Sequence, residues 1–100
     1  MKRLIFAQSV RLRFAELQTA GADFRLYDAA LGALQRGREL PPHFRDHALR
    51  APLTGYRSCI VGFTPEDKTI VAVYKSSPRQ VIVFAVDEHD QAYESMIERD

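Results

Sequence analysis

The sequence predicts an α+β fold with the element order β-α-α-β-β-β-α, in which helices pack on one face of an antiparallel sheet and leave the other face partly open. Two observations predict it. Apolar residues recur at helical spacing between residues 9 and 36, and β-branched and aromatic runs separated by short turns follow residue 55. The length of 100 residues, with 46% hydrophobic and 27% charged side chains, fits one folded domain spanning residues 1–100.

The N-terminal third predicts a strand followed by a helical hairpin. Residues 3–8 form a short apolar run typical of a strand. Ser9 is expected to cap a helix that extends to about Ala20, and Asp23 to cap a second helix over residues 24–36. Each helix carries an apolar stripe: Val10, Phe14 and Leu17 in the first, and Phe24, Tyr27, Leu31 and Leu34 in the second. A glycine follows each helix and is expected to end it.

The remaining chain predicts an extended stretch, three strands and a final helix. Two prolines, at positions 41 and 42, stop the second helix, and residues 43–54 are polar and expected to be extended. The breaks at residues 64–68 and 76–79 have the length and composition of hairpin turns, which predicts an antiparallel meander. Its strands are expected at residues 56–63, 69–75 and 80–86, and the final helix at about residues 90–99.

Charge and cysteine content exclude several classes of protein. The net charge of +1 gives no global electrostatic argument for nucleic acid. Residues 1–57 hold ten basic and five acidic side chains and residues 58–100 four and eight, which on charge alone indicates a solvated surface rather than a basic groove. Cys59 is the only cysteine, so an internal disulfide and a multi-cysteine zinc site are excluded, and a buried strand position is expected for it. No apolar run reaches the ~20 residues of a membrane span.

Three segments carry a resemblance to a known family. Residues 40–49 read LPPHFRDHAL, residues 55–59 read GYRSC, and residues 87–93 read DEHDQAY. Together they resemble the YafQ-like branch of the RelE/ParE toxin superfamily, and the expected element order is also that of the superfamily. The chain departs from the YafQ pattern at Ile60, where that branch has a histidine, and in lacking its Asp-Trp pair.

The resemblance implies a RelE-like fold and the toxin of a type II toxin–antitoxin system. Such a toxin acts in the cytoplasm, enters the ribosomal A site and cuts mRNA there without a metal or other cofactor. Its expected partners are mRNA, the ribosome and a cognate antitoxin, with which it forms a heterotetramer, and no membrane is involved.

Metal-free RNA scission needs a general base for the ribose 2′-OH, a general acid for the leaving 5′ oxygen, and cations at the phosphate. Imidazole suits both proton transfers near neutral pH. His47 is the candidate base, and the alternative is a loop histidine paired with Asp46. His89 is the candidate acid or base, and the alternative is a solvated helix cap. His43 carries no motif match and is expected at the surface.

Four further residues complete the candidate site. Arg57 could bind the scissile phosphate, and a structural ion pair is the alternative. Tyr93 lies one helical turn after His89 and could stack on a base, and core packing is the alternative. Arg45 and Lys75 are candidate substrate-binding cations. The rival function is a catalytically inactive or ParE-like module that binds its antitoxin or DNA gyrase without cutting RNA.

Overall fold

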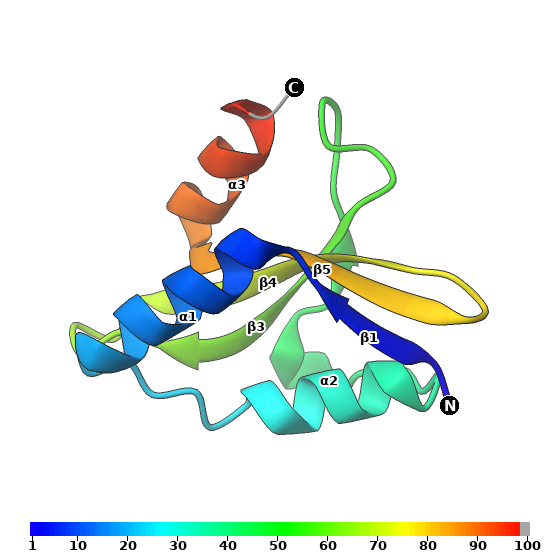
Figure 1. Cartoon of the computed structure of the whole chain (residues 1–100), viewed down its shortest axis with the longest axis horizontal. Helices are drawn as coiled ribbons and strands as arrows, with labels where there is room; N and C mark the ends of the chain where they lie inside the picture. Colours follow the sequence, from blue (N-terminus) through cyan, green and yellow to red (C-terminus); the bar gives the residue numbers. More distant parts are fainter. Residues whose placement is uncertain (99–100) are drawn as a thin grey trace.

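The structure, a computed structural model, describes residues 1–98. In this part of the chain three α-helices surround a five-stranded sheet (Figure 1). The elements are β1 (Arg3–Phe6), α1 (Gln8–Thr19), α2 (Tyr27–Gln35), the 3-10 turn η1 (Pro42–Phe44), β2 (His47–Ala48), β3 (Arg57–Phe63), β4 (Thr69–Ser76), β5 (Gln80–Glu88) and α3 (His89–Glu98). The α+β class and the predicted element order are confirmed, with η1 and the two-residue strand β2 added in the stretch expected to be merely extended.

The sheet has the strand order β1-β5-β4-β3-β2. The predicted meander β3-β4-β5 is antiparallel, and β2 extends it beyond β3. β1 pairs with β5 in parallel, with Arg3 opposite Gln80 and Phe6 opposite Val83, so the sheet is mixed rather than wholly antiparallel. A parallel pair requires a long crossover connection, and here the helical hairpin together with the meander provides it.

The two faces of the sheet carry different helices. The hairpin of α1 and α2 packs on one face, as predicted, over a core that includes Ile70, Ala72 and Tyr74 of β4. Helix α3 packs on the opposite face, which the sequence predicted to be open. The reason is the continuous apolar run of β4, whose other side chains, Val71 and Val73, form a second core with α3.

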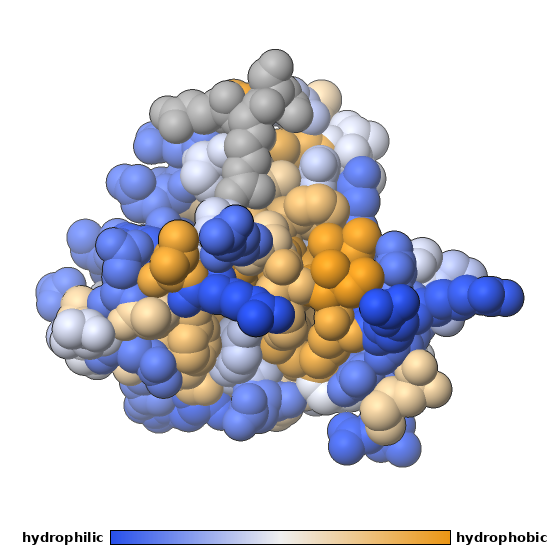
Figure 2. All heavy atoms as spheres, in the orientation of Figure 1, coloured by the Kyte–Doolittle hydropathy of each residue, from blue (hydrophilic) through white to orange (hydrophobic). Residues whose placement is uncertain are grey.

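The second core is the smaller one and is only partly covered. Ala92 and Met96 of α3 and Leu53 of the loop before β3 are buried in it. Half-buried side chains flank them, among them Tyr56 and Phe84. Figure 2 shows apolar atoms reaching the surface between hydrophilic side chains on this side of the molecule. The face that was predicted to be open is therefore uncovered only beside α3.

The helices begin at other residues than predicted. Helix α1 begins at Gln8 without a side-chain cap, so Ser9 lies inside it. Helix α2 begins at Tyr27 because Asp23 is used elsewhere: its carboxylate accepts the Arg25 backbone N–H at 2.9 Å and its backbone forms a bridge with Phe63. These bonds hold residues 23–26 outside the helix. The predicted end of the last helix, residue 99, lies outside the described residues.

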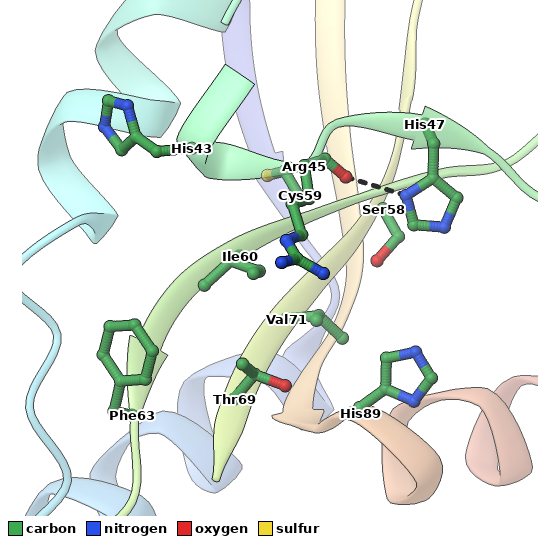
Figure 3. Close-up of a pocket in the computed structure, with 10 residues that line it drawn as sticks. All are labelled: His43, Arg45, His47, Ser58, Cys59, Ile60, Phe63, Thr69, Val71 and His89. Atoms are coloured by element: carbon green, nitrogen blue, oxygen red, sulfur yellow. Dashed lines mark hydrogen bonds between the residues drawn. The ribbon is translucent and has the colours of Figure 1, made fainter. Parts of the chain in front are cut away.

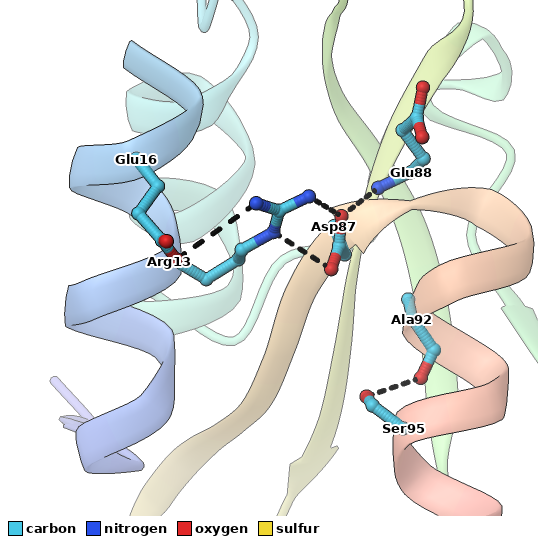
Figure 4. Close-up of polar contacts among 6 residues, drawn as sticks. All are labelled: Arg13, Glu16, Asp87, Glu88, Ala92 and Ser95. Atoms are coloured by element: carbon cyan, nitrogen blue, oxygen red, sulfur yellow. Dashed lines mark hydrogen bonds and ion pairs between the residues drawn. The ribbon is translucent and has the colours of Figure 1, made fainter. Parts of the chain in front are cut away.

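The end of β5 is fixed by an ion pair to α1. The Arg13 guanidinium donates two hydrogen bonds of 3.0 Å to the Asp87 carboxylate, one of whose oxygens also accepts the Glu88 backbone N–H at 2.8 Å (Figure 4). A two-point contact of this kind restrains orientation as well as distance. It therefore holds the strand end from which His89 and α3 continue. None of the helices in residues 1–98 has the length and apolar character needed to span a bilayer.

Candidate functional site

A pocket of about 600 Å³ opens on the face of the sheet that carries α3. Its walls come from the segment joining η1 to β2, from β3, from the start of β4 and from the first residue of α3. The residues that line it are His43, Arg45, His47, Ser58, Cys59, Ile60, Phe63, Thr69, Val71 and His89 (Figure 3). The pocket thus brings together His47 and His89, which are 42 positions apart in the sequence.

His47 is an exposed histidine with one ring nitrogen occupied. It lies in β2 opposite Ser58 of β3. Its Nδ1 is 2.7 Å from the backbone carbonyl oxygen of Arg45, and because a carbonyl only accepts, Nδ1 must carry the proton (Figure 3). In the neutral ring Nε2 is then the nitrogen with a free lone pair. His47 therefore does not pair with Asp46, which was the alternative interpretation.

His89 is the first residue of α3 and is half exposed. Its Nδ1 lies 3.0 Å from the Asp90 carboxylate, and its ring meets the Tyr93 ring edge to face with centroids 4.5 Å apart. Nε2 is again the ring nitrogen not used in that contact. Figure 3 shows the His47 and His89 rings on the same side of the pocket, with the Arg45 guanidinium reaching in beside them.

Tyr93 does not line the pocket but contacts two residues that do, Ser58 and His89. Its hydroxyl donates a 3.0 Å hydrogen bond to Ser58 Oγ, and Ser58 is completely buried. Because Ser58 is the cross-strand partner of His47, this bond links the His89–Tyr93 pair to the strand beside His47. Ser58 is a functional candidate that the sequence analysis missed. Its only signal was a serine amid apolar strand residues.

Arg45 lines the pocket, where its guanidinium is a candidate substrate-binding cation. Its backbone is in the left-handed conformation, with φ 50° and ψ 42°. His43 is exposed, as predicted, and its ring rests on Phe44 with centroids 4.4 Å apart. It nevertheless contributes to the pocket wall, which the sequence did not indicate.

Arg57 lies on the opposite face of the sheet, because strand alternation separates it from Ser58. Its guanidinium donates to the Asp46 carboxylate at 3.1 and 3.4 Å, so its contacts are those of the ion-pair alternative. The hydroxyl of Tyr74 also donates to Asp46. Burial and this bond to a carboxylate raise the pKa of Tyr74, which therefore stays a neutral donor.

Lys75 is also outside the pocket. Its ammonium group lies 4.3 Å above the Tyr56 ring, a cation–π contact on an exposed part of β4. The structure thus brings Arg45 to the two histidines but neither Lys75 nor Arg57.

The floor of the pocket is largely apolar, and its cysteine is buried. Ile60 and Val71 form part of it, and Cys59 is buried with 1% of its surface exposed. Burial raises the pKa of the Cys59 thiol to about 12, so the reactive thiolate is not available near neutral pH. Within residues 1–98, no cluster of three or more metal-binding side chains occurs. The imidazoles of His47 and His89 are side chains of the lining that can transfer protons near neutral pH.

Comparison with known proteins gives a match in fold only. Neither a protein-family model nor a curated protein sequence matches the chain significantly. Among solved structures, a copper-bound mutant toxin from Helicobacter pylori superposes with a TM-score of 0.79 at 24% identity, covering 91% of this chain and 98% of that one. The toxin in the E. coli DinJ–YafQ toxin–antitoxin complex gives 0.76 at 17% identity, covering 92% and 97%.

The chain has the RelE-like toxin fold. YafQ from E. coli strain BL21(DE3) superposes with a TM-score of 0.75 at 16% identity, covering 91% of this chain and 97% of YafQ. The resemblance to the YafQ-like branch is thereby confirmed at the level of the fold. The RelE-like fold accounts for both the meander and the helical hairpin.

Proposed function

We propose that the protein is the toxin of a toxin–antitoxin pair and that it cuts mRNA on the ribosome by metal-independent general acid–base catalysis. One observation carries the proposal: His47 and His89 line a single open pocket, and each uses Nδ1 for a local contact, so that Nε2 is left for a substrate. Two imidazoles beside one cation can supply the base, the acid and the charge stabilisation that cutting RNA through its 2′-OH requires.

The roles follow from the partners of the two rings. His47 Nε2 takes the proton of the ribose 2′-OH, whose oxygen then attacks phosphorus. His89 gives a proton to the departing 5′ oxygen, and the products are a 2′,3′-cyclic phosphate and a free 5′-OH. We assign the acid to His89, whose Nδ1 lies against the Asp90 carboxylate, and the base to His47, whose Nδ1–H donates to a backbone carbonyl and leaves Nε2 as an acceptor. Arg45 stabilises the extra negative charge at phosphorus.

The partners proposed are an antitoxin, mRNA and the ribosomal A site, all in the cytoplasm. The likeness to YafQ in the DinJ–YafQ complex, a toxin–antitoxin complex, supports an antitoxin partner for this chain. A heterotetramer with that antitoxin is part of the proposal. The net charge of +1 attracts mRNA and ribosomal RNA only weakly, and this favours the non-catalytic alternative.

Removal of either imidazole is expected to abolish cutting. We expect wild-type protein to cut ribosome-bound mRNA equally well with and without EDTA, and His47→Ala and His89→Ala each to lower the rate by 10²-fold or more, as loss of a general acid or base does. His43→Ala is the matched control, because His43 lines the same pocket without a proposed role. Primer extension on translating ribosomes measures the cut. Undiminished cutting by both variants would reject the assignment.

Ile60 favours a second candidate function. An apolar side chain in the middle of the pocket adds no group for proton transfer, which fits a module that binds its antitoxin or DNA gyrase without cutting RNA. Induced expression distinguishes the two functions. Growth arrest with failing translation supports the ribonuclease, arrest with altered DNA supercoiling supports gyrase binding, and no arrest supports an inactive antitoxin-binding module.

A further inference from the structure

Asp46 and His47 are neighbours in the chain but lie on opposite faces of the sheet. His47 pairs with Ser58 and faces the pocket, whereas Asp46 turns toward the hairpin side and meets Arg57 and Tyr74. The Asp46 carboxylate thus lies on the face of the sheet opposite the pocket. It nevertheless belongs to the backbone segment that carries both Arg45 and His47.

The Asp46 carboxylate is held by three donated hydrogen bonds. Two come from the Arg57 guanidinium, at 3.1 and 3.4 Å, and one comes from the Tyr74 hydroxyl. Arg57 and Tyr74 are themselves cross-strand partners in β3 and β4, and Tyr74 is 1% exposed within the main core. The Asp46 carboxylate is therefore attached to the buried main core, and its bonds from Arg57 are charge-assisted.

The backbone on either side of Asp46 needs the support of these hydrogen bonds. β2 has only two residues, so few ladder bonds hold it, and Arg45 just before it is in the left-handed region. That conformation is unfavourable for a residue with a Cβ and persists where the surroundings impose it. In this conformation the Arg45 carbonyl oxygen accepts a hydrogen bond from the His47 Nδ1–H at 2.7 Å.

We propose that Asp46 is a positioning residue for His47. Arg57 and Tyr74 bind the Asp46 carboxylate on the opposite face, and Asp46 thereby holds the left-handed turn at Arg45. The Arg45 carbonyl then keeps the proton of His47 on Nδ1, so that the lone pair of Nε2 is left in the pocket. The inference rests on the proposed catalytic role of His47. It assigns Arg57 a supporting role through Asp46 in place of the phosphate contact expected from the sequence.

The test reads the position of the His47 proton directly. Full-length protein labelled with ¹⁵N-histidine is studied by long-range ¹H–¹⁵N correlation at pH 8.5, where imidazole is ordinarily neutral. We expect wild-type His47 to carry its proton on Nδ1. Asp46→Asn turns one accepting oxygen into a donor facing Arg57, and Tyr74→Phe removes only the hydroxyl, so both are expected to give a mixture of the two tautomers.

The matched control is Asp23→Asn. Asp23 also pairs with an arginine, Arg25, and keeps a backbone acceptor bond that asparagine can still make, but it lies outside the pocket. This variant is expected to leave His47 unchanged. On ribosome-bound mRNA, Asp46→Asn is expected to lower kcat about tenfold to a hundredfold with KM changed less, because the nucleophile's base is misplaced while binding surfaces remain.

Each outcome has one meaning. A pure Nδ1–H tautomer in both Asp46→Asn and Tyr74→Phe overturns the proposal, and so does a tautomer mixture that also occurs in Asp23→Asn. Tyr74→Phe decides the matter if Asp46→Asn fails to fold. A wild-type protein that cuts no RNA overturns the proposed function alone, because the tautomer experiment stands without any cleavage.

Discussion

Ser58 and Tyr93 join the two halves of the pocket through a single hydrogen bond. The Ser58 hydroxyl is fully buried, and a buried hydroxyl without a partner costs about 1–3 kcal/mol. Tyr93 supplies that partner at 3.0 Å and offers its ring to His89. A base-stacking role for Tyr93, expected from its spacing after His89, would have to use the same ring that now supports the imidazole.

A double-mutant cycle tests this link. We expect Tyr93→Phe to destabilise the fold by about 1–2 kcal/mol, because the Ser58 hydroxyl loses its partner, and the double variant with Ser58→Ala to cost less than the sum of the single changes. Urea unfolding measures the free energies. Additive effects would show that the bond contributes nothing. RNA cutting that survives Tyr93→Phe but fails in Tyr93→Leu would favour the ring over the hydroxyl.

Motifs identified the site residues better than they identified the contacts of those residues. His47 and His89 were expected at one patch, and they line one pocket. The place of Arg57 could not be predicted, because its face depends on the register of β3 against β4, in which it pairs with Tyr74. A shift of one residue in that pairing would have turned Arg57 toward the face that carries the pocket.

Gly62 fixes how the helical hairpin joins the sheet. It lies at an irregularity in the β3–β4 pairing, and a Cβ placed on it would be 2.3 Å from the Asp23 carbonyl oxygen. The chain can therefore form the Asp23–Phe63 bridge only because position 62 has no side chain. This bridge also delays the start of α2, since it keeps Asp23 paired with β3 and a turn at residues 25 and 26 precedes the helix.

Gly62→Ala is expected to destabilise the protein by about 1–3 kcal/mol, the usual cost of forcing a methyl group against backbone. Gly32→Ala is the control. Gly32 lies inside α2, where its added methyl would meet only the flexible end of Arg36, and alanine there is expected to be neutral or to stabilise by up to about 1 kcal/mol. Thermal unfolding of both variants measures the difference. Equal stability would contradict the close approach.

Local patterns predicted the elements but not how all of them pair. The meander and the hairpin follow from periodicity and turn residues, which act within a few positions. The parallel pairing of β1 with β5, the added strand β2 and the side on which α3 packs depend on contacts between distant segments. An apolar run such as residues 70–74 fits a strand covered on both faces, and only the folded chain shows what covers each.

For the molecule as a whole, charge is spread rather than gathered at the pocket. The net charge is +1, and Arg45 is the one permanently charged side chain among the residues that line the pocket. Binding to RNA outside the ribosome should therefore depend on very few phosphate contacts.

The salt dependence of RNA binding tests that view. We expect single-stranded RNA to bind weakly, with a slope of log affinity against log salt near −0.7, the value for about one phosphate contact. Arg45→Gln should bring the slope toward zero, and Lys75→Gln should leave it unchanged, because Lys75 lies over Tyr56 away from the pocket. Fluorescence anisotropy gives the slopes. A steep wild-type slope that Lys75→Gln lowers would extend the RNA path along β4.

The pairing of β1 with β5 also sets the order in which a growing chain can become complete. Arg3 is made 77 residues before Gln80, its neighbour in the sheet, and His89 follows nine residues after Gln80. A nascent chain ending before residue 80 has neither a place for its first strand nor the second imidazole. The same segment of the chain therefore completes the sheet and supplies the second imidazole of the pocket, so the candidate site cannot form before the sheet does.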